Sequence, residues 1–137
     1  MILTIENKIE KLINRILYFA VVLTNSCEDW IIDKIDDQAL AVGEYVGWGT
    51  GTGTISKNNT TLFNESSEAR ILATRTQPRS DQIQWVSMHT ANATKTITEA
   101  GLFTAITAGN LLIHGDFGGI GVNSGDKVEF TIILEIQ

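Results

Sequence analysis

The sequence predicts a mainly β domain: an antiparallel β-sandwich or jelly-roll-like fold, preceded by one or two amino-terminal α-helices. Three observations support this class. The carboxyl-terminal segment alternates apolar and polar residues, short β-like runs punctuated by Gly and Asn fill the middle, and an apolar seam with heptad-like spacing opens the chain. With 137 residues, 43% of them hydrophobic, the chain is long enough for one core and rich enough to fill it.

The carboxyl-terminal segment, residues 125–136, has the period of two that is typical of a half-buried antiparallel strand. One face carries only apolar residues, namely Val128, Phe130, Ile132, Leu134 and Ile136. The other face is polar apart from Ile133. The abundance of Ile, Val, Phe and Thr favours a strand as well.

Five further runs read as strands, and together with the last one they make six: residues 45–48, 70–76, 82–90, 96–103 and 111–117. We expect turns at residues 77–80 and 107–110 and a break at Gly118-Gly119. The run 82–90 is apolar on both faces, with Trp85 on one and Val86 and Met88 on the other. Such two-sided burial indicates a helix or an assembly partner on the outer face.

The first 22 residues are predicted to form a helical extension, and residues 23–137 the β-rich domain. The seam of this helix is Ile2, Ile5, Ile9, Leu12, Ile16, Phe19 and Leu23. The seam is a candidate interface, either with the domain itself or with a neighbouring subunit in a homo-oligomer. Its apolar run, residues 16–23, is shorter than the roughly 20 residues of a membrane span, and no signal-peptide cleavage site follows.

A second, short helix is expected to follow, ending near Asp36. Thr24 or Asn25 can cap its first turn, and Glu28 and Asp29 in that turn suit the helix dipole.

Charge and cysteine content exclude several classes of function. The net charge of −6 argues against nucleic-acid binding and against attachment to an anionic membrane. Cys27 is the only cysteine, so it can form neither an internal disulfide nor a cysteine-rich zinc site. We expect Cys27 to be a buried apolar residue of a protein made in a reducing cytoplasm.

The residues that could carry chemistry do not form a recognisable catalytic pattern. The Gly-x-Gly-x-Gly tract at residues 49–53 runs into a polar loop instead of opening a helix, so it is interpreted as a strand end and not as a phosphate loop. His89 and His114 lack metal-ligand spacing and are interpreted as partly exposed strand residues. We therefore expect no enzyme activity, no metal and no cofactor.

Glu99 is an unusual charge, because it lies inside an otherwise apolar strand. A carboxylate in that position needs a partner, and Arg70 and Arg75 are the candidates for a structural ion pair.

Several sequence blocks, taken in order, resemble a family of small virion proteins of tailed bacteriophages. The blocks are Leu23-Thr24-Asn25 with the helix after it, YVGWGTGTGT at 45–54, L-x-x-E-x-x-x-A-R at 62–70, ITEAGLF at 97–103, G-x-L-L at 109–112, Asp116-Phe117 and the strand 125–132. The resemblance covers residues 23–137 and brings no catalytic residues. It implies a β-rich component of a tail fibre, neck or head decoration, with residues 1–22 as a candidate attachment arm.

The sequence therefore predicts a virion structural protein, made in the host cytoplasm. The favoured role is a capsid cement or decoration protein that assembles with itself and binds the major capsid protein. A neck or tail-fibre component is the alternative. A carbohydrate-binding module is a third hypothesis, for which Trp48 and Trp85 are the candidate stacking residues.

Overall fold

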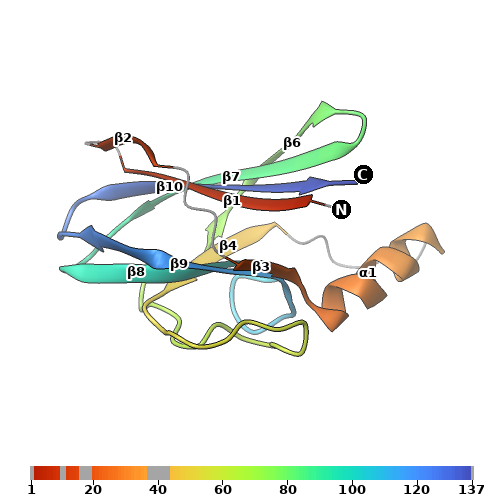
Figure 1. Cartoon of the computed structure of the whole chain (residues 1–137), viewed down its shortest axis with the longest axis horizontal. Helices are drawn as coiled ribbons and strands as arrows, with labels where there is room; N and C mark the ends of the chain where they lie inside the picture. The colour runs from red at the N-terminus through yellow and green to blue at the C-terminus, as the bar shows by residue number, and fades with distance from the viewer. Residues whose placement is uncertain (1, 10–11, 16–19, 37–43, 137) are drawn as a thin grey trace.

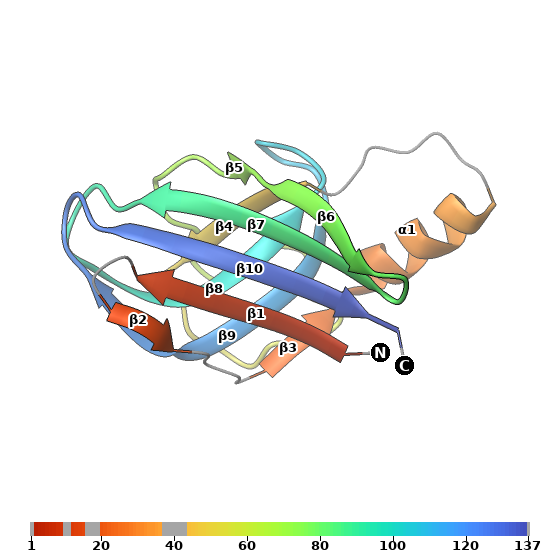
Figure 2. The same cartoon turned by 90° about the horizontal axis from the view of Figure 1, so that it is seen from above.

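The computed structural model describes residues 2–9, 12–15, 20–36 and 44–136, with side chains from residue 21 onward. Two antiparallel sheets of five strands lie face to face, and the one helix of the described residues lies at one end (Figures 1 and 2). The strand order is β2-β1-β10-β7-β6 in sheet A and β3-β9-β8-β4-β5 in sheet B. The predicted mainly β class is confirmed.

Each sheet draws strands from both halves of the chain. Sheet A contains β1 (Ile2–Ile9), β2 (Leu12–Arg15), β6 (Thr74–Arg79), β7 (Gln82–Thr90) and β10 (Lys127–Glu135). Sheet B contains β3 (Ala20–Leu23), β4 (Tyr45–Gly49), β5 (Ile71–Leu72), β8 (Lys95–Phe103) and β9 (Leu111–Val122).

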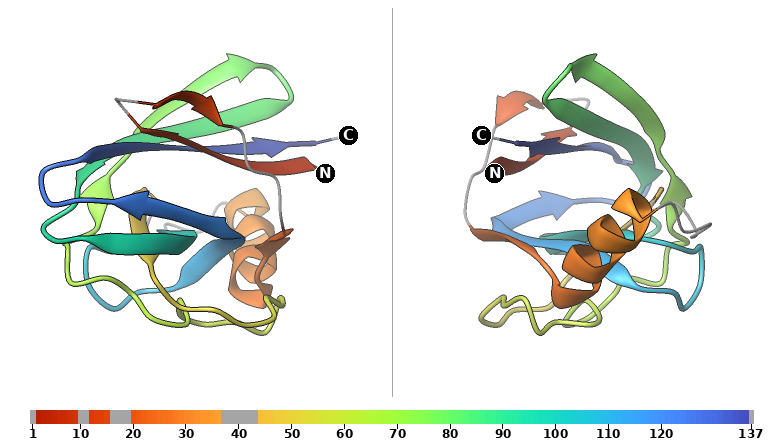
Figure 3. Two further views of the ribbon diagram at one scale, coloured as in Figure 1. Left: turned by 60° about the vertical axis from the view of Figure 1, so that its left-hand side comes forward. Right: turned by 90° about the vertical axis from the view of Figure 1, so that its right-hand side faces the viewer.

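The main core lies between the two sheets (Figure 3). The alternation predicted for the last strand is observed, since Val128, Phe130, Ile132 and Leu134 are all buried. Ile136 follows the end of β10 and is 70% exposed. Trp85 of β7 and Leu102 of β8 contribute to the same cluster.

A second layer covers the other face of sheet B. The segment from residue 50 to residue 69 runs beneath this face, on the side away from sheet A (Figure 1). Leu62 of this segment packs against Phe103 and Leu111, with Tyr45 beside them. Sheet B is therefore buried on both faces, which explains the continuous burial at the start of β9.

The helix predicted over residues 1–22 is wrong. Residues 2–9, 12–15 and 20–23 form strands instead, and β1 pairs with the whole of β10, from Ile2↔Glu135 to Ile9↔Val128. The isoleucine-rich segment fits a strand as well as a helix, and an isolated helix of this length is marginal in water. Pairing with β10 and β9 instead holds β1 and β3 in the two sheets. Ile16 and Phe19 lie outside the described residues.

The second predicted helix is present as α1 (Asn25–Ile35). The Thr24 side chain caps it by accepting from the Cys27 N–H at 3.2 Å, and its hydroxyl donates to the Leu111 carbonyl at 2.6 Å. The cap therefore also attaches the helix to β9, and Cys27 is buried as expected.

Two strand boundaries differ from the prediction. The strand expected over residues 70–76 is divided at Ala73, where the chain passes from β5 in sheet B to β6 in sheet A. β6 continues through Pro78, which is tolerated because β6 is an edge strand with an irregular register at this point. β9 continues through Gly118-Gly119, and Gly119 takes a positive φ of 92° opposite a register shift in β8.

Candidate functional site

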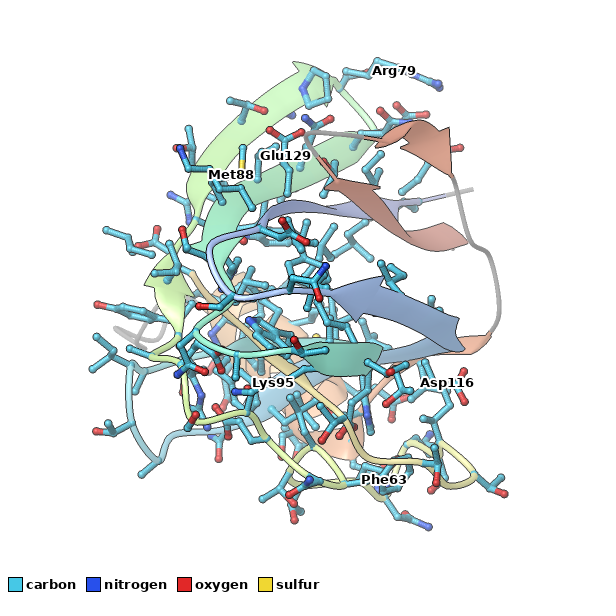
Figure 4. All side chains as sticks on the ribbon, turned by 90° about the vertical axis from the view of Figure 1, so that its left-hand side faces the viewer. Phe63, Arg79, Met88, Lys95, Asp116 and Glu129 are labelled. Atoms are coloured by element: carbon cyan, nitrogen blue, oxygen red, sulfur yellow. The ribbon has the colours of Figure 1, made fainter. Side chains whose placement is uncertain are left out.

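The glycine-rich loop after β4 is held at both of its ends. The Thr50 N–H donates to the Asn64 carbonyl at 3.0 Å, and the Ser66 N–H donates to the Trp48 carbonyl at 2.9 Å. An isolated bridge also joins Gly49 to Glu65. Residues 50–64 consequently form a closed loop under sheet B, and Phe63 in this loop is labelled in Figure 4.

The Glu99 carboxylate is the centre of this loop. Backbone N–H groups donate to its Oε1 from Gly51 at 3.2 Å and Asn64 at 2.8 Å, and to its Oε2 from Phe63 at 2.9 Å. His114 Nε2 lies 2.8 Å from the same Oε2. Four donors thus surround a side chain that is fully buried. A buried carboxylate is tolerated when its lone pairs are satisfied in this way.

Opposing effects act on the pKa of Glu99. Burial raises the pKa, but the bond from His114 and the backbone N–H groups of Asn64 and Phe63 lower it by more. The pKa of Glu99 therefore lies below its ordinary value, and the carboxylate stays charged at neutral pH.

His114 of β9 connects this carboxylate to the far part of the loop. Its Nδ1 lies 3.3 Å from Asn59 Oδ1, which also accepts the Ser56 N–H at 2.7 Å. The Phe63 ring lies against the imidazole, with centroids 5.0 Å apart. His114 is fully buried, so the prediction of a partly exposed residue is wrong. The pair was missed because Glu99 and His114 become neighbours only when β8 pairs with β9.

The glycines of the tract let the loop approach Glu99. A Cβ on Gly49 would lie 2.4 Å from the Asn64 carbonyl oxygen, and one on Gly51 would lie 2.5 Å from the Asn64 nitrogen. A Cβ on Gly53 would lie 2.9 Å from the nearest atom of the Phe63 ring. The repeated glycine therefore has a packing explanation, and the tract leaves a strand and enters a loop as predicted.

The ion pair predicted between Glu99 and Arg70 or Arg75 requires correction, because both arginines have other acidic partners. Arg70 binds Glu65 through two hydrogen bonds of 2.6 and 2.9 Å. Arg75 of β6 lies 3.4 Å from Glu44. The Glu99 oxygens are instead occupied by backbone N–H groups of the loop and by His114.

Arg70 joins two loops. Its guanidinium donates to the carbonyls of Ala105 at 3.0 Å and Ala108 at 2.7 Å, and it stacks on the Phe103 ring at 3.4 Å. Because the fork-shaped guanidinium reaches a carboxylate, two carbonyls and a ring at once, it fastens the loop after β8 to the loop after β4.

A second ion pair, which the sequence did not indicate, lies beside this loop. Lys95 Nζ is 2.8 Å from Glu68, and the ammonium lies 5.4 Å from the centroid of the Trp48 ring. Bonds from Lys95, Ser66 and the Asn92 N–H outweigh the effect of burial and lower the pKa of Glu68 to about 2.

His89 occupies a different environment, in the core between the sheets. It is 2% exposed, so the expected partial exposure is wrong here too. Its Nε2 lies 2.9 Å from Ser87 Oγ and its ring meets Phe130 edge-on at 5.2 Å, whereas Nδ1 has no partner among the described residues. Burial lowers the pKa of His89 to about 4, although the charge of Glu68 acts in the opposite direction.

The candidate sugar-stacking residues are not on the surface. Trp48 is 2% exposed and Trp85 is 3% exposed, and both belong to the main core. A sugar cannot stack on a ring that is covered on both faces, so the carbohydrate-binding hypothesis loses the residues on which it rested.

The predicted amino-terminal interface does not exist as a helical seam. Its residues Ile2, Ile5 and Ile9 lie in β1 and Leu12 in β2. Leu23, at the end of β3, is half-buried and packs against the main core. The structure therefore places Leu23 inside the domain.

Further properties limit the chemistry of the described residues. Burial raises the pKa of Cys27 to about 12, so this thiol is not a nucleophile at neutral pH. Within the described ranges, no group of three or more His, Cys, Asp or Glu side chains is placed to hold a metal ion. No helix in the same ranges has the length and hydropathy to cross a membrane.

Comparisons with models of known protein families, with curated proteins and with solved structures find no match to this chain.

Proposed function

We propose that this chain is a non-enzymatic structural protein of a tailed-phage virion. The specific role we favour is a capsid cement or decoration protein that assembles with itself and binds the major capsid protein. The observation that carries the proposal is that three blocks of the phage-like pattern, residues 45–54, 62–70 and 97–103, meet in one unit around Glu99.

The polar groups of these blocks serve the scaffold. Glu99 holds the glycine-rich loop, and Glu65 and Arg70 fasten it to the next loop. Each of these contacts is intramolecular, and Glu99 has no exposed surface through which it could meet a substrate. A pattern of residues that secures loops on a β framework suits a part of a particle, where the shape of each subunit must be constant.

In the finer classification of the fold, we propose a β-sandwich with jelly-roll-like pairing at one side. The first and last strands of sheet A, β1 and β10, are neighbours, and β3 and β9 are neighbours in sheet B. The amino-terminal strands β1 and β3 thus pair with the last two strands of the chain, β10 in sheet A and β9 in sheet B. Such pairing supports a virion role, because it covers the β10 edge and part of the β9 edge, which would otherwise favour aggregation.

Copy number in the particle tests the proposal. Virions of the phage whose genome encodes this chain are purified, and the chain is quantified against the major capsid protein by mass spectrometry. A cement protein is expected on the order of hundreds of copies, as the symmetry of a capsid shell requires, whereas about a dozen or fewer would favour the neck or tail alternative. Absence from purified particles would contradict both roles.

Self-assembly is tested separately with the full isolated chain. Sedimentation velocity is expected to give a homo-oligomer whose mass is a small multiple of the 15.0 kDa chain. A monomer at all accessible concentrations contradicts the self-association that we propose.

A further inference from the structure

One edge of β7 is covered over only part of its length. On one side, β10 pairs with β7 along its whole extent, from Lys127↔Thr90 to Glu135↔Gln82. On the other side, β6 pairs only from Arg79↔Gln82 to Thr74↔Val86, because the chain crosses between the sheets at Ala73. In the described part of the chain, no strand pairs with this side of β7 beyond Val86.

The backbone direction along β7 follows from the bonds just beyond its two ends. The Ile136 N–H donates to the Asp81 carbonyl at 3.0 Å, and the Ala91 N–H donates to the Asp126 carbonyl at 2.9 Å. Residues 81 and 91 therefore both face the β10 side. Backbone groups alternate in direction along a strand, and the β7–β10 register is continuous, so every odd-numbered residue between them faces β10.

The even-numbered residues face the other side. β6 pairs with this side of β7 between Gln82 and Val86. Met88 and Thr90 consequently direct their N–H and C=O groups toward the uncovered edge. These four backbone groups form a short, open template for another strand.

An open depression lies along this edge. It has a volume of about 300 Å³ and is lined by Glu68, Ala69, Ile71, Met88, His89 and Thr90. Its apolar rim is accessible, since Ile71 is 37% exposed and Met88 45% exposed. Met88 is visible beside Glu129 on the outer side of sheet A in Figure 4.

We propose that the Met88–Thr90 edge binds an extended segment of another virion protein, which adds to sheet A as a strand. The backbone groups of Met88 and Thr90 pair with the main chain of that segment, and one of its apolar side chains enters the depression against Ile71 and Met88. The identity of the partner as a virion protein rests on the proposed function, whereas the edge itself does not.

A single segment fits this opening better than a second copy of the chain. Residues 68–71 form the wall opposite β7, and a second copy would bring the same wall against the same opening. A lone extended segment has no such wall.

Amide NMR on the full chain tests the edge without a particle. The probe is a seven-residue peptide of alternating valine and threonine, and its matched control carries N-methyl groups on the amides that would pair. We expect binding with a Kd on the order of 1 mM, shifts of the Met88 and Thr90 amides, and hydrogen exchange there slowed about tenfold at saturation. The N-methylated control is expected to leave these amides unchanged.

A matched pair of variants tests the depression. Ile71→Thr keeps a β-branched residue but removes apolar surface from the rim, so we expect the Kd of the peptide to rise about fivefold. Ile106→Thr makes the same change at an exposed site that does not line the depression, and is expected to leave the Kd unchanged.

Three results would overturn the proposal. In the free chain, Met88 and Thr90 amides that exchange as slowly as those of Ser87 and His89 would mean that the edge is already paired. Saturating peptide that leaves both amides unmoved would mean that the edge accepts no strand. Protection of both amides by dimerisation of the chain alone would assign the edge to a second copy. Peptide binding without incorporation into virions would refute the proposed function and leave the edge intact.

Discussion

The two buried histidines belong to regions that accommodate polar groups in opposite ways. His114 lies between sheet B and the glycine-rich loop, where Glu99, Asn59 and backbone N–H groups form a connected network. His89 lies between the two sheets, where its ring meets the Phe130 ring edge-on and one ring nitrogen has no partner among the described residues.

The difference shows what each layer contributes. In the loop layer, backbone N–H groups donate to the charged Glu99 carboxylate, so this charge determines the path of the loop backbone. In the inter-sheet layer, the charge of Glu68 offsets the effect of burial only in part, so burial keeps His89 neutral. The Glu99 network fixes one conformation of the loop, whereas the buried His89 makes the stability of the core sensitive to acid.

Removing the charge of Glu99 should have the largest effect. Glu99→Gln keeps the shape of the side chain but turns an amide donor toward N–H groups, so we expect the free energy of unfolding to fall by about 3–5 kcal/mol. Urea denaturation measures this loss. The control Glu129→Gln, on the outer face of sheet A, is expected to change stability by about 0.5 kcal/mol or less. A loss below about 1 kcal/mol in Glu99→Gln would contradict the role assigned to the network.

Acid should weaken the inter-sheet layer before it weakens the loop layer. The unfolded chain binds a proton at His89 below a pH of about 6.5, whereas the folded chain does so only near its pKa of about 4, so stability falls as the pH decreases between these values. The loss reaches roughly 3 kcal/mol only when the pH falls below the folded pKa of about 4. The stabilisation that comes from the depressed pKa of Glu99 is lost at a lower pH. It is present above the ordinary pKa of 4.5 and is lost as the pH falls below that value.

Urea denaturation at pH 7, 6 and 5 separates the two layers. A His89→Leu variant should lose the part of the pH dependence between 6.5 and 4.5 that His89 contributes, whatever its absolute stability. If the variant and the original chain keep the same slope in this range, His89 is not the group that titrates.

Filling the space beside Glu99 should have an intermediate effect. Gly51→Ala places a Cβ 2.5 Å from backbone and side-chain atoms of the loop, and we expect a loss of about 1–3 kcal/mol in thermal or urea unfolding. Gly121→Ala is the matched control, because a Cβ there meets nothing within 4 Å. Equal losses in the two variants would mean that close approach is not the reason for the glycine.

Replacing Arg70 should have the smallest effect of this series. Arg70→Lys keeps the charge but cannot reach Glu65 and two carbonyls together, so we expect a loss of about 1–2 kcal/mol and faster exchange of the amides in the loop after β8. Arg79→Lys, an exposed ion pair with Asp81, should be nearly neutral. A neutral Arg70→Lys would show that charge alone holds the two loops.

Much of the fold could be predicted because it is written in local patterns. Strict alternation identified β10, β7 was predicted with its observed bounds, and the capping candidates Thr24 and Asn25 indicated α1, whose cap is Thr24. The prediction for the amino-terminal segment was wrong because the spacing of its isoleucines fits a helical period of 3.5, while the residue type also suits a strand. Pairing with β10 and β9, which lie far from this segment in the sequence, favours the strand over the helix.

The sequence by itself determined the strand faces of the core, the position of α1 and the fact that Glu99 needs a partner. Only the tertiary structure decided that the partner is His114, that Arg70 binds Glu65, and that the glycines lie against Asn64 and Phe63. The physical reason is range: alternation and capping act between near neighbours in the chain. The partner of a buried charge depends on which strands pair, and so does the strand edge that is left open at Met88 and Thr90.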